Sequence, residues 1–386
     1  MDVVVTGIGL FSSLGSLAKS WQSLLAGNSG IGLHQPFREL LPRPLGLIEE
    51  TPVQLGYLNQ FAVAAALEDA GLTTPLPDCG VAIGSSRGCQ ALWEQLAGQM
   101  YVSSLNPTSY TSHPNVKIED WLETLPHQGA IAAAGQVGAT GPVLSPMAAC
   151  ATGIWAIAQG CELIQIGQCQ RVIAGATEAP VTPLTLAGFD KMGVLAKTGC
   201  YPFDKHREGL VLGEGAAVLV LESAELALSR GASIYGQVLG FGLTCDADHV
   251  STPSSNNRSA ILAIKQCLDR SNLRAVDIDY IHAHGTSTKL NDQREAELIE
   301  ELFPQGVSVS STKGATGHTL GASGAMGAAF CLMALRDQQL PPCVGLKEPE
   351  FDLDLVTGPR RSEIRRVLCF SFGFGGQNAI IGLGKF

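Results

Sequence analysis

The sequence predicts an α/β protein in which sheets are buried between layers of helices, with two similar halves in one chain. Short apolar runs that end in glycine turns alternate with longer segments of helical spacing. A hydrophobic content of 45% and a charged fraction of only 16% are typical of a heavily buried globular protein. Patterns of the first half also recur in the second half. These observations together favour a duplicated α/β architecture.

The recurrence involves four segments of the first half, each of which joins an apolar run to glycines or other small residues. The pairs are 3–9 with 237–242, 80–85 with 280–285, 143–160 with 314–330, and 213–221 with 375–383. We expect the halves to meet near Arg230. The predicted domains are therefore an N-terminal half, residues 1–230, and a C-terminal half, residues 231–386.

Charge, apolar content and cysteine usage exclude several classes of function. The net charge of −10 argues against nucleic acid or an anionic membrane as the main partner. No apolar run approaches the roughly 20 residues that span a membrane. The start of the chain, Met1 to Val5, lacks the basic residues of a signal peptide. The 11 cysteines form no C-x-x-C pair, which indicates reduced thiols and a cytoplasmic location.

Residues 29–128 carry the weakest chemical signals. Prolines mark several loops there, residues 58–70 have the pattern of a helix that ends at Gly71, and residues 106–116 form a polar loop. We expect a surface excursion without catalytic groups.

The segment 143–160 is the first candidate for chemistry. Val143 and Leu144 begin a short apolar strand, and small residues with helical spacing follow Cys150. Cys150 is therefore expected at a strand-to-helix turn, where free N–H groups and the helix dipole favour the thiolate over the thiol. Considered alone, Cys150 is also typical of a buried structural cysteine.

The segment 201–209 contains a dense cluster of charges in a sparsely charged chain, which predicts an exposed loop. Local ion pairs would explain it, each worth less than about 1 kcal/mol. Alternatively, the loop is the rim of a pocket, and Lys205 and Arg207 face an anionic carrier.

The segment 280–288 ends a predicted strand with two histidines. His284 precedes a glycine and several hydroxyl side chains, so it is a candidate general base or hydrogen-bond donor. His282 and His284 share one face of a regular strand, so a metal site with the distant His318 is an alternative. No acidic or cysteine ligand lies close by in the sequence, which weakens that alternative. His282 itself is more typical of a satisfied core histidine.

The segments 310–325 and 370–378 complete the set. Lys313 and His318 stand in a run of small residues, where burial without partners would be costly. Glu295 is the nearest candidate counter-charge for Lys313. The motif of a phosphate-binding loop is absent. The turn that includes Phe374 could donate a backbone N–H to an oxyanion and supply a ring that gates a pocket.

As a set, these segments resemble the β-ketoacyl-acyl carrier protein synthases of the elongating Cys-His-His type. They match that family from about Gly135 to the end of the chain, in the family's order. The matching motifs are A-C-A-T-G at Cys150, A-H-G-T-S-T at His284, S-S-T-K-x-x-T-G-H-x-x-G-A-x-G with Lys313 and His318, and F-G-F-G-G-x-N with Phe374. The resemblance implies the thiolase fold, a five-layer αβαβα core of two similar halves, normally as a homodimer.

The resemblance also implies a decarboxylative Claisen condensation without metal or organic cofactor. Cys150 would take an acyl group from the phosphopantetheine arm of an acyl carrier protein, and the N–H groups of Cys150 and Phe374 would hold the oxyanion. Neutral His284 and His318 would stabilise the enolate that forms when malonyl-acyl carrier protein loses CO2.

Further roles follow from the same resemblance. Lys313, paired with Glu295, would hold the histidines in place electrostatically. Thr286 and Thr288 would bind the pantetheine amides. Phe203 and the gate Phe374 would contact the substrate. Lys205 and Arg207 would face the carrier from a mobile loop that also contains Asp204.

The chain departs from the family before the cysteine, at residues 121–127, and near Phe61, where the basic residues that help dock the carrier are missing. Both a housekeeping carrier and that of a specialised pathway therefore remain open, as do fatty acid and polyketide synthesis, acyl length, and pairing with itself or a related subunit.

Three alternative functions remain at this point. One is a non-elongating, chain-length-factor-like partner subunit of a ketosynthase heterodimer, which usually lacks the cysteine. A thiolase acting on coenzyme A would need a second cysteine near the C-terminal glycine turn, and Cys369 stands before that turn. A metal-dependent hydrolase would use His282, His284 and His318.

Overall fold

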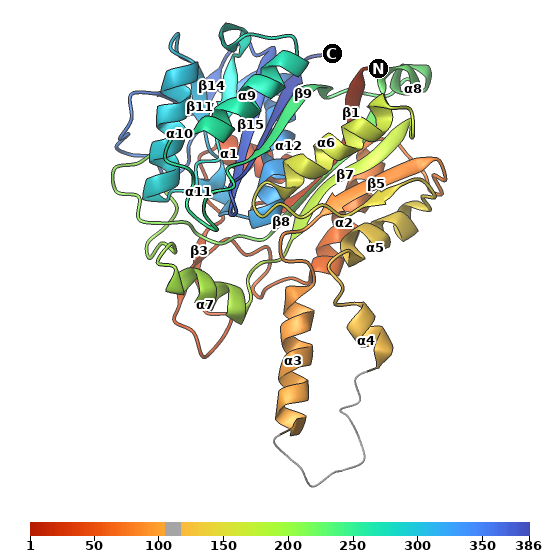
Figure 1. Ribbon diagram of the computed structural model, residues 1–386, viewed down its shortest axis with the longest axis vertical. Helices are drawn as coiled ribbons and strands as arrows, with labels where there is room; N and C mark the ends of the chain where they lie inside the picture. Colours follow the sequence, from red (N-terminus) through yellow and green to blue (C-terminus); the bar gives the residue numbers. More distant parts are fainter. Residues whose placement is uncertain (105–116) are drawn as a thin grey trace.

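The computed structural model describes residues 1–104 and 117–386 (Figure 1). One large mixed sheet dominates it, and the polar loop predicted at 106–116 lies outside the described residues. The strands in hydrogen-bonding order are β13 (Asp354–Leu355), β11 (Ser308–Ser310), β10 (Tyr280–His282), β15 (Arg366–Gly373), β16 (Gln377–Gly384), β9 (Gly236–Cys245), β1 (Val3–Ser12), β8 (Gly215–Ser223), β7 (Arg171–Glu178), β5 (Cys79–Gly84) and β6 (Val143–Leu144).

The strand order repeats on the two sides of the β1–β9 pair. Outward from the centre, one side runs β1-β8-β7-β5-β6 and the other runs β9-β16-β15-β10-β11. On both sides the first two pairings are antiparallel and the next two are parallel. The prediction of two pseudo-duplicated halves is therefore confirmed. The exact boundary at Arg230 stays a prediction.

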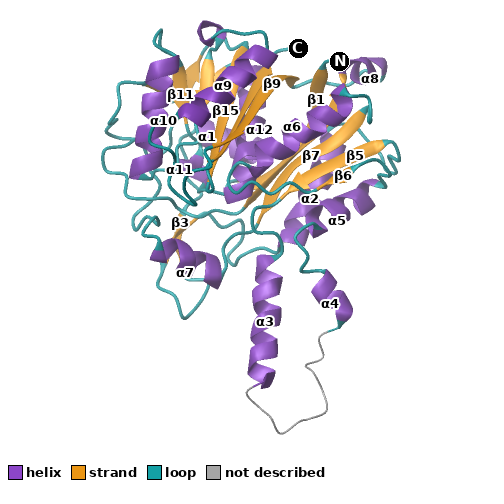
Figure 2. Ribbon diagram, in the orientation of Figure 1, coloured by secondary structure: helices purple, strands orange, loops and turns teal. Residues whose placement is uncertain are grey.

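The helices form three layers around the two halves of this sheet (Figure 2). In the middle, α6 (Thr152–Gln165) and α12 (Ser323–Asp337) pack on each other and on strands of both halves. One outer layer consists of α2 (Leu55–Asp69) and α5 (Gln128–Val137), and the other of α9 (Arg258–Arg270) and α10 (Lys289–Leu302). The result is the predicted αβαβα arrangement.

Small residues allow the two middle helices to approach closely. Residues 323–335 of α12 are all buried, and five of them are glycine or alanine within 324–329. At the crossing, a Cβ on Gly153 would lie 2.5 Å from the backbone nitrogen of Ala325 and 2.8 Å from its Cβ. Any larger residue at position 153 would force the helices apart. The strand β8, covered on both faces, is buried at every position, as its apolar sequence predicts.

The shorter elements lie around this core. Helices α3 and α4 extend away from the main body (Figure 1), and α7 lies near their base. The remaining elements are β2 (Gly15–Ser16), α1 (Leu17–Leu25), β3 (Gly32–His34), β4 (Arg43–Leu45), α3 (Gln90–Ser104), α4 (Ile118–Leu122), α7 (Pro183–Lys191), α8 (Ala224–Ser229), α11 (Lys313–Thr316), β12 (Gln339–Leu340), β14 (Arg360–Arg361) and two 3-10 turns, η1 (Ala275–Asp277) and η2 (Leu320–Ala322). Within the described ranges, none of the helices combines the length and apolarity required to cross a bilayer.

Replacement of Gly153 tests the packing of the middle layer. Gly153→Ala should lower the free energy of unfolding by about 2–3 kcal/mol, because overpacking of a close-packed core typically costs this much. Gly98→Ala, in the exposed interior of α3 where an added Cβ meets nothing within 4 Å, should instead raise it by up to about 1 kcal/mol. Urea denaturation measures both. Equal stability of the two variants would contradict the tight crossing.

Candidate active site

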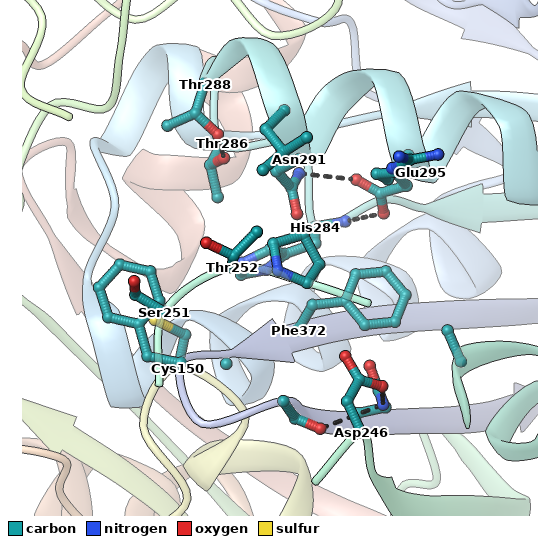
Figure 3. Close-up of a pocket in the computed structure, with 18 of the residues that line it drawn as sticks. Cys150, Asp246, Ser251, Thr252, His284, Thr286, Thr288, Asn291, Glu295 and Phe372 are labelled. Carbon is teal, nitrogen blue, oxygen red and sulfur yellow. Dashed lines mark hydrogen bonds between the residues drawn. The ribbon is translucent and has the colours of Figure 1, made fainter. Parts of the chain in front are cut away.

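Three side chains from both halves of the chain converge at one place. The Sγ atom of Cys150 and nitrogen atoms of His284 and His318 all lie within 4.8 Å of one another. The two imidazole rings meet edge to face, with centroids 5.3 Å apart. All three residues are buried, yet they line one cavity of about 350 Å³ (Figure 3). A nucleophile and two proton-handling groups therefore face the same substrate space.

The turn that presents Cys150 is held from both halves. The preceding residue, Ala149, has φ +47°, a conformation that costs energy for a residue other than glycine. The hydroxyl of Thr152, the first residue of α6, accepts the N–H of Ala148 at 2.8 Å and donates to the carbonyl of Ala149 at 2.7 Å. From β15, the hydroxyl of Ser371 donates to the carbonyl of Cys150 at 2.8 Å. The strand-to-helix turn expected from the sequence is present.

The backbone of His284 is fixed by two ionisable side chains. The Glu295 carboxylate accepts the N–H groups of His284 and Gly285 at 2.6 and 2.7 Å (Figure 3). The Nζ atom of Lys313 donates to the carbonyl oxygen of His284. The expected direct pair of Lys313 with Glu295 is therefore wrong in detail. The ammonium and the carboxylate instead hold opposite ends of the same residue.

The second imidazole is oriented by its own segment. The Nδ1 atom of His318 lies 2.9 Å from the hydroxyl of Ser323, at the start of α12, and its backbone N–H donates to the carbonyl of Val211 at 2.6 Å. These contacts leave Nε2 of His318 for the cavity. The Nδ1 atom of His284 is buried and has no hydrogen-bond partner among the described residues.

Burial sets the protonation states of the site. Desolvation, reinforced by the charge of Lys313, holds the pKa values of His284 and His318 well below their usual range, so both imidazoles are neutral near pH 7. Desolvation also raises the pKa of the Cys150 thiol to about 11, although the charge of Lys313 opposes this shift. The thiolate expected from the helix start is thus not the resting form. A neutral imidazole is suited to accept the thiol proton during attack.

Several predicted substrate-binding residues line the cavity. The hydroxyls of Thr286 and Thr288 lie 2.9 Å apart on one wall (Figure 3). Phe374 also lines the cavity and packs against the apolar cluster that contains Cys150, and its backbone N–H lowers the pKa of the thiol. The ring of Phe374 stacks on Phe189 of α7, with centroids 5.9 Å apart. The cavity thus has a polar wall and an aromatic wall.

The assignment of Phe203 to substrate binding is wrong. Its side chain is completely buried, packs edge to face on Phe351 and does not line the cavity. Its backbone N–H donates to Asp292 at 2.8 Å. A Cβ added to Gly285 would lie 3.0 Å from the Phe203 ring, so this ring supports the turn after His284 from behind.

The expected mobile, carrier-facing loop is also different. Arg207 is only 4% exposed and binds the carbonyl groups of Asp204 and Lys289 and the carboxylate of Glu350. The carboxylate of Asp204 accepts two backbone N–H groups of residues 347 and 348. The loop is therefore anchored, and Arg207 cannot face a carrier. Lys205 is exposed, as expected.

The alternative sites proposed from the sequence are not assembled. His282 lies outside the cluster, with Nε2 3.1 Å from the hydroxyl of Thr312 and Nδ1 3.8 Å from the sulfur of Cys369. The metal-hydrolase set is therefore wrong. Cys369 is fully buried and does not line the cavity, so it cannot act as the second cysteine of a thiolase. The atoms of Cys150, His284 and His318 are spaced closely enough to hold a soft metal ion.

One part of the site was missed by the sequence reading. The loop between β9 and α9 lines the cavity, and its carboxylate Asp246 accepts hydrogen bonds from Asn378 at 2.8 Å and from the N–H of Ser254 at 3.0 Å (Figure 3). Its polar composition over residues 246–257 was the available signal. The lining residues not predicted include Phe189, Met192, Asp246, Ser251, Thr252, Ser254, Asn257, Asn291, Arg294 and Phe372.

A thiol and two neutral imidazoles in a polar-rimmed cavity of an αβαβα fold define a thiol-dependent acyltransferase. The family described as beta-ketoacyl synthase matches the chain through its N-terminal domain at residues 48–227 and its C-terminal domain at residues 235–347. The chain therefore belongs to the beta-ketoacyl synthase family, and it is an enzyme of the acyltransferase class.

Full-length relatives agree with this membership. The 3-oxoacyl-[acyl-carrier-protein] synthase 2 of Synechocystis sp. is 35% identical, covering 100% of this chain and 98% of that protein. The enzyme of the same name from Vibrio harveyi is 34% identical, covering 97% and 96%. Among solved structures, the ketosynthase complex AntDE:AntF, described as a type II PKS acyl-carrier protein with its ketosynthase, matches with a TM-score of 0.93 and 27% identity over 100% and 99% of the chains. The ishigamide ketosynthase/chain length factor matches with a TM-score of 0.92 and 28% identity over 100% and 99%.

The effect of Lys313 on the nucleophile can be tested with Lys313→Met. Because the ammonium lowers the pKa of Cys150, its loss should raise that pKa, and alkylation of Cys150 by iodoacetamide at pH 8 should slow by about tenfold for each pKa unit. Peptide mass spectrometry from pH 6 to 11 measures the profile. The matched control is Lys265→Met at an exposed lysine of α9, which should leave the profile unchanged. An unchanged profile in Lys313→Met would contradict the electrostatic role.

Proposed function

We propose that the protein catalyses the decarboxylative Claisen condensation of an acyl thioester with malonyl-acyl carrier protein, through an acyl-enzyme on Cys150. The observation that carries this proposal is the convergence of Cys150 with the neutral imidazoles of His284 and His318 in one cavity. The presence of the nucleophile favours this function over that of a non-elongating partner subunit, the second candidate suggested by the sequence.

In the first half-reaction, the sulfur of Cys150 attacks the carbonyl carbon of the acyl thioester. The thiol proton passes to a neutral imidazole and then to the departing pantetheine sulfur. The backbone N–H groups of Cys150 and Phe374 hold the oxyanion, and each such donor typically contributes about 2.7–4 kcal/mol to the transition state. The acyl group remains as a thioester on Cys150.

In the second half-reaction, malonyl-acyl carrier protein enters and loses CO2. The neutral imidazoles of His284 and His318 donate hydrogen bonds to the thioester oxygen, where the enolate charge develops. A neutral donor is suited to this step because the enolate gains charge only transiently. The carbanion attacks the acyl carbon on Cys150, the thiolate leaves, and β-ketoacyl-acyl carrier protein forms. Lys313 and Glu295 hold the backbone of His284 in place during both half-reactions.

The substrates arrive on the phosphopantetheine arm of an acyl carrier protein, so this chemistry requires neither an organic cofactor nor a metal. Thr286 and Thr288, which line the cavity, bind the pantetheine amides through their hydroxyls in this proposal. The carrier belongs to fatty acid or polyketide synthesis, in the cytoplasm. The protein acts either as a homodimer or as a pair with a related ketosynthase subunit, and the second arrangement has a parallel in the ishigamide ketosynthase/chain length factor. The two halves that together form this enzyme are residues 1–230 and residues 231–386.

Replacement of the nucleophile separates the two half-reactions. Cys150→Ala should lower condensation by about 1,000-fold or more, because no acyl-enzyme can form. It should retain decarboxylation of malonyl-acyl carrier protein, because both imidazoles remain. Chromatography of the loaded carrier and release of labelled CO2 measure the two reactions.

The matched control is Cys161→Ala, which removes a buried cysteine from the same helix, α6, outside the cavity. It should condense at close to the wild-type rate. A Cys150→Ala variant that still elongates the acyl carrier would refute the mechanism.

A further inference from the structure

Glu178, the last residue of β7, is a fully buried carboxylate next to the site. In the described part of the chain it forms no ion pair with a lysine, arginine or histidine. Desolvation raises its pKa, which shows the cost of keeping a charge in this position. A buried, unpaired carboxylate is tolerated only where hydrogen bonds to it are numerous and well directed.

Five donors satisfy this carboxylate, and they come from two separate turns. One turn is Ser85–Arg87, directly after β5, and the other is Gly321 in η2. The donors and distances are the Ser85 hydroxyl to Oε1 at 2.8 Å, the Arg87 N–H to Oε1 at 3.0 Å, the Ser86 N–H to Oε2 at 2.7 Å, the Ser86 hydroxyl to Oε2 at 2.6 Å, and the Gly321 N–H to Oε2 at 2.9 Å. The carboxylate therefore joins the N-terminal half to the segment that follows His318.

The second of these turns determines where His318 lies. Gly321 comes three residues after His318, and the intervening Leu320 packs in the same apolar cluster as Cys150. A Cβ on Gly321 would lie 2.4 Å from Oε2 of Glu178 and 2.8 Å from the backbone nitrogen of Ser86. This contact leaves no room for adjustment. The contact between Gly321 and Glu178 thus fixes the position of the His318 segment relative to Cys150.

The first turn reaches the opposite wall of the site. The guanidinium of Arg87 lies over the ring of Phe189, 5.6 Å from its centroid. Phe189 stacks in turn on Phe374, which packs against the same apolar cluster as Cys150. A shift of the Ser85–Arg87 turn would therefore be passed on to Phe374. The carboxylate of Glu178 therefore binds both the turn that leads to Phe374 and the turn that follows His318.

We propose that Glu178 is a positioning residue for the condensation: its five hydrogen bonds fix His318 and Phe374 around Cys150, without contact to substrate. The proposal rests on the roles assigned above to Cys150 and His318, and it extends the machinery into residues 29–128, where the sequence predicted none. The Ser85–Arg87 turn is part of that region.

A purely electrostatic role for Glu178 would have the opposite signature. The negative charge of Glu178 raises the pKa of Cys150, so removal of the charge alone should make the thiol more reactive. Loss of positioning should instead slow the steps that need His318. Reactivity of the sulfur and decarboxylation of the malonyl group therefore distinguish the two roles.

Glu178→Gln tests the proposal. Whichever way the amide is turned, its NH2 group faces backbone N–H groups that cannot rotate away, either that of Arg87 or those of Ser86 and Gly321. Decarboxylation of malonyl-pantetheine should fall at least tenfold, whereas alkylation of Cys150 by iodoacetamide at pH 8 should be unchanged or faster. Gly321→Ala, which crowds the same carboxylate from the other side, should have the same effects. The double variant should lose little more than either single variant, because both act on one contact.

Glu222→Gln is the matched control. Glu222 is a buried carboxylate of the neighbouring strand β8 and pairs with Arg171, at the opposite end of β7. Seven residues of strand place it about 23 Å from Glu178. Glu222→Gln should lower stability in urea but leave the decarboxylation rate of the folded protein unchanged.

Two results would overturn the proposal. One is a wild-type rate of decarboxylation in Glu178→Gln. The other is a loss that Glu222→Gln reproduces at equal loss of stability, since that would show a merely structural role. The wild-type rate and the Cys150→Ala variant test the proposed function separately. The ratio of the decarboxylation rate of Glu178→Gln to that of the wild type tests only the role of Glu178.

Discussion

The close contact of α6 with α12 is the constraint on which the site depends. The backbone of Gly153 lies against Ala325, and this contact brings together the starts of two helices that correspond in the two halves. Cys150 precedes one of these helices, and His318 precedes the other. Each half alone therefore provides an incomplete site. The nucleophile and its imidazoles meet only because small residues allow the middle layer to close.

Burial at this junction also determines the chemistry. In a desolvated site, a charge costs free energy unless it is paired, so the resting forms are a protonated thiol and two neutral imidazoles. Two ionisable side chains, Lys313 and Glu295, bind the backbone of His284 from either end. In the proposed mechanism, charge then develops only during the reaction, on the oxyanion or the enolate. This arrangement suits a reaction that alternates between acyl transfer and carbanion formation.

The sequence was sufficient for the duplicated α/β fold and for the segments that meet at the cavity, because strand periodicity, glycine turns and motif order are local signals. The αβαβα order of the layers was implied by the family resemblance. It failed where the answer depends on contacts between distant residues. Arg207 looked like an exposed charge, but its partner Glu350 comes from a segment far along the chain. The sequence showed that Cys150 stands at the start of a helix, which favours the thiolate. It did not show the burial of Cys150, which raises the pKa of the thiol. Glu178 gave no signal, since its donors belong to two distant turns.

The most direct measurement of the central claim is peptide mass spectrometry of the whole protein after exposure to acyl carriers loaded with chains of graded length. If one sulfur faces two imidazoles in a substrate cavity, a single acyl adduct should form, it should map to Cys150, and addition of malonyl-acyl carrier protein should discharge it as β-ketoacyl product. An adduct spread over several of the 11 cysteines, or an adduct on Cys150 that malonyl-acyl carrier protein cannot discharge, would contradict the account.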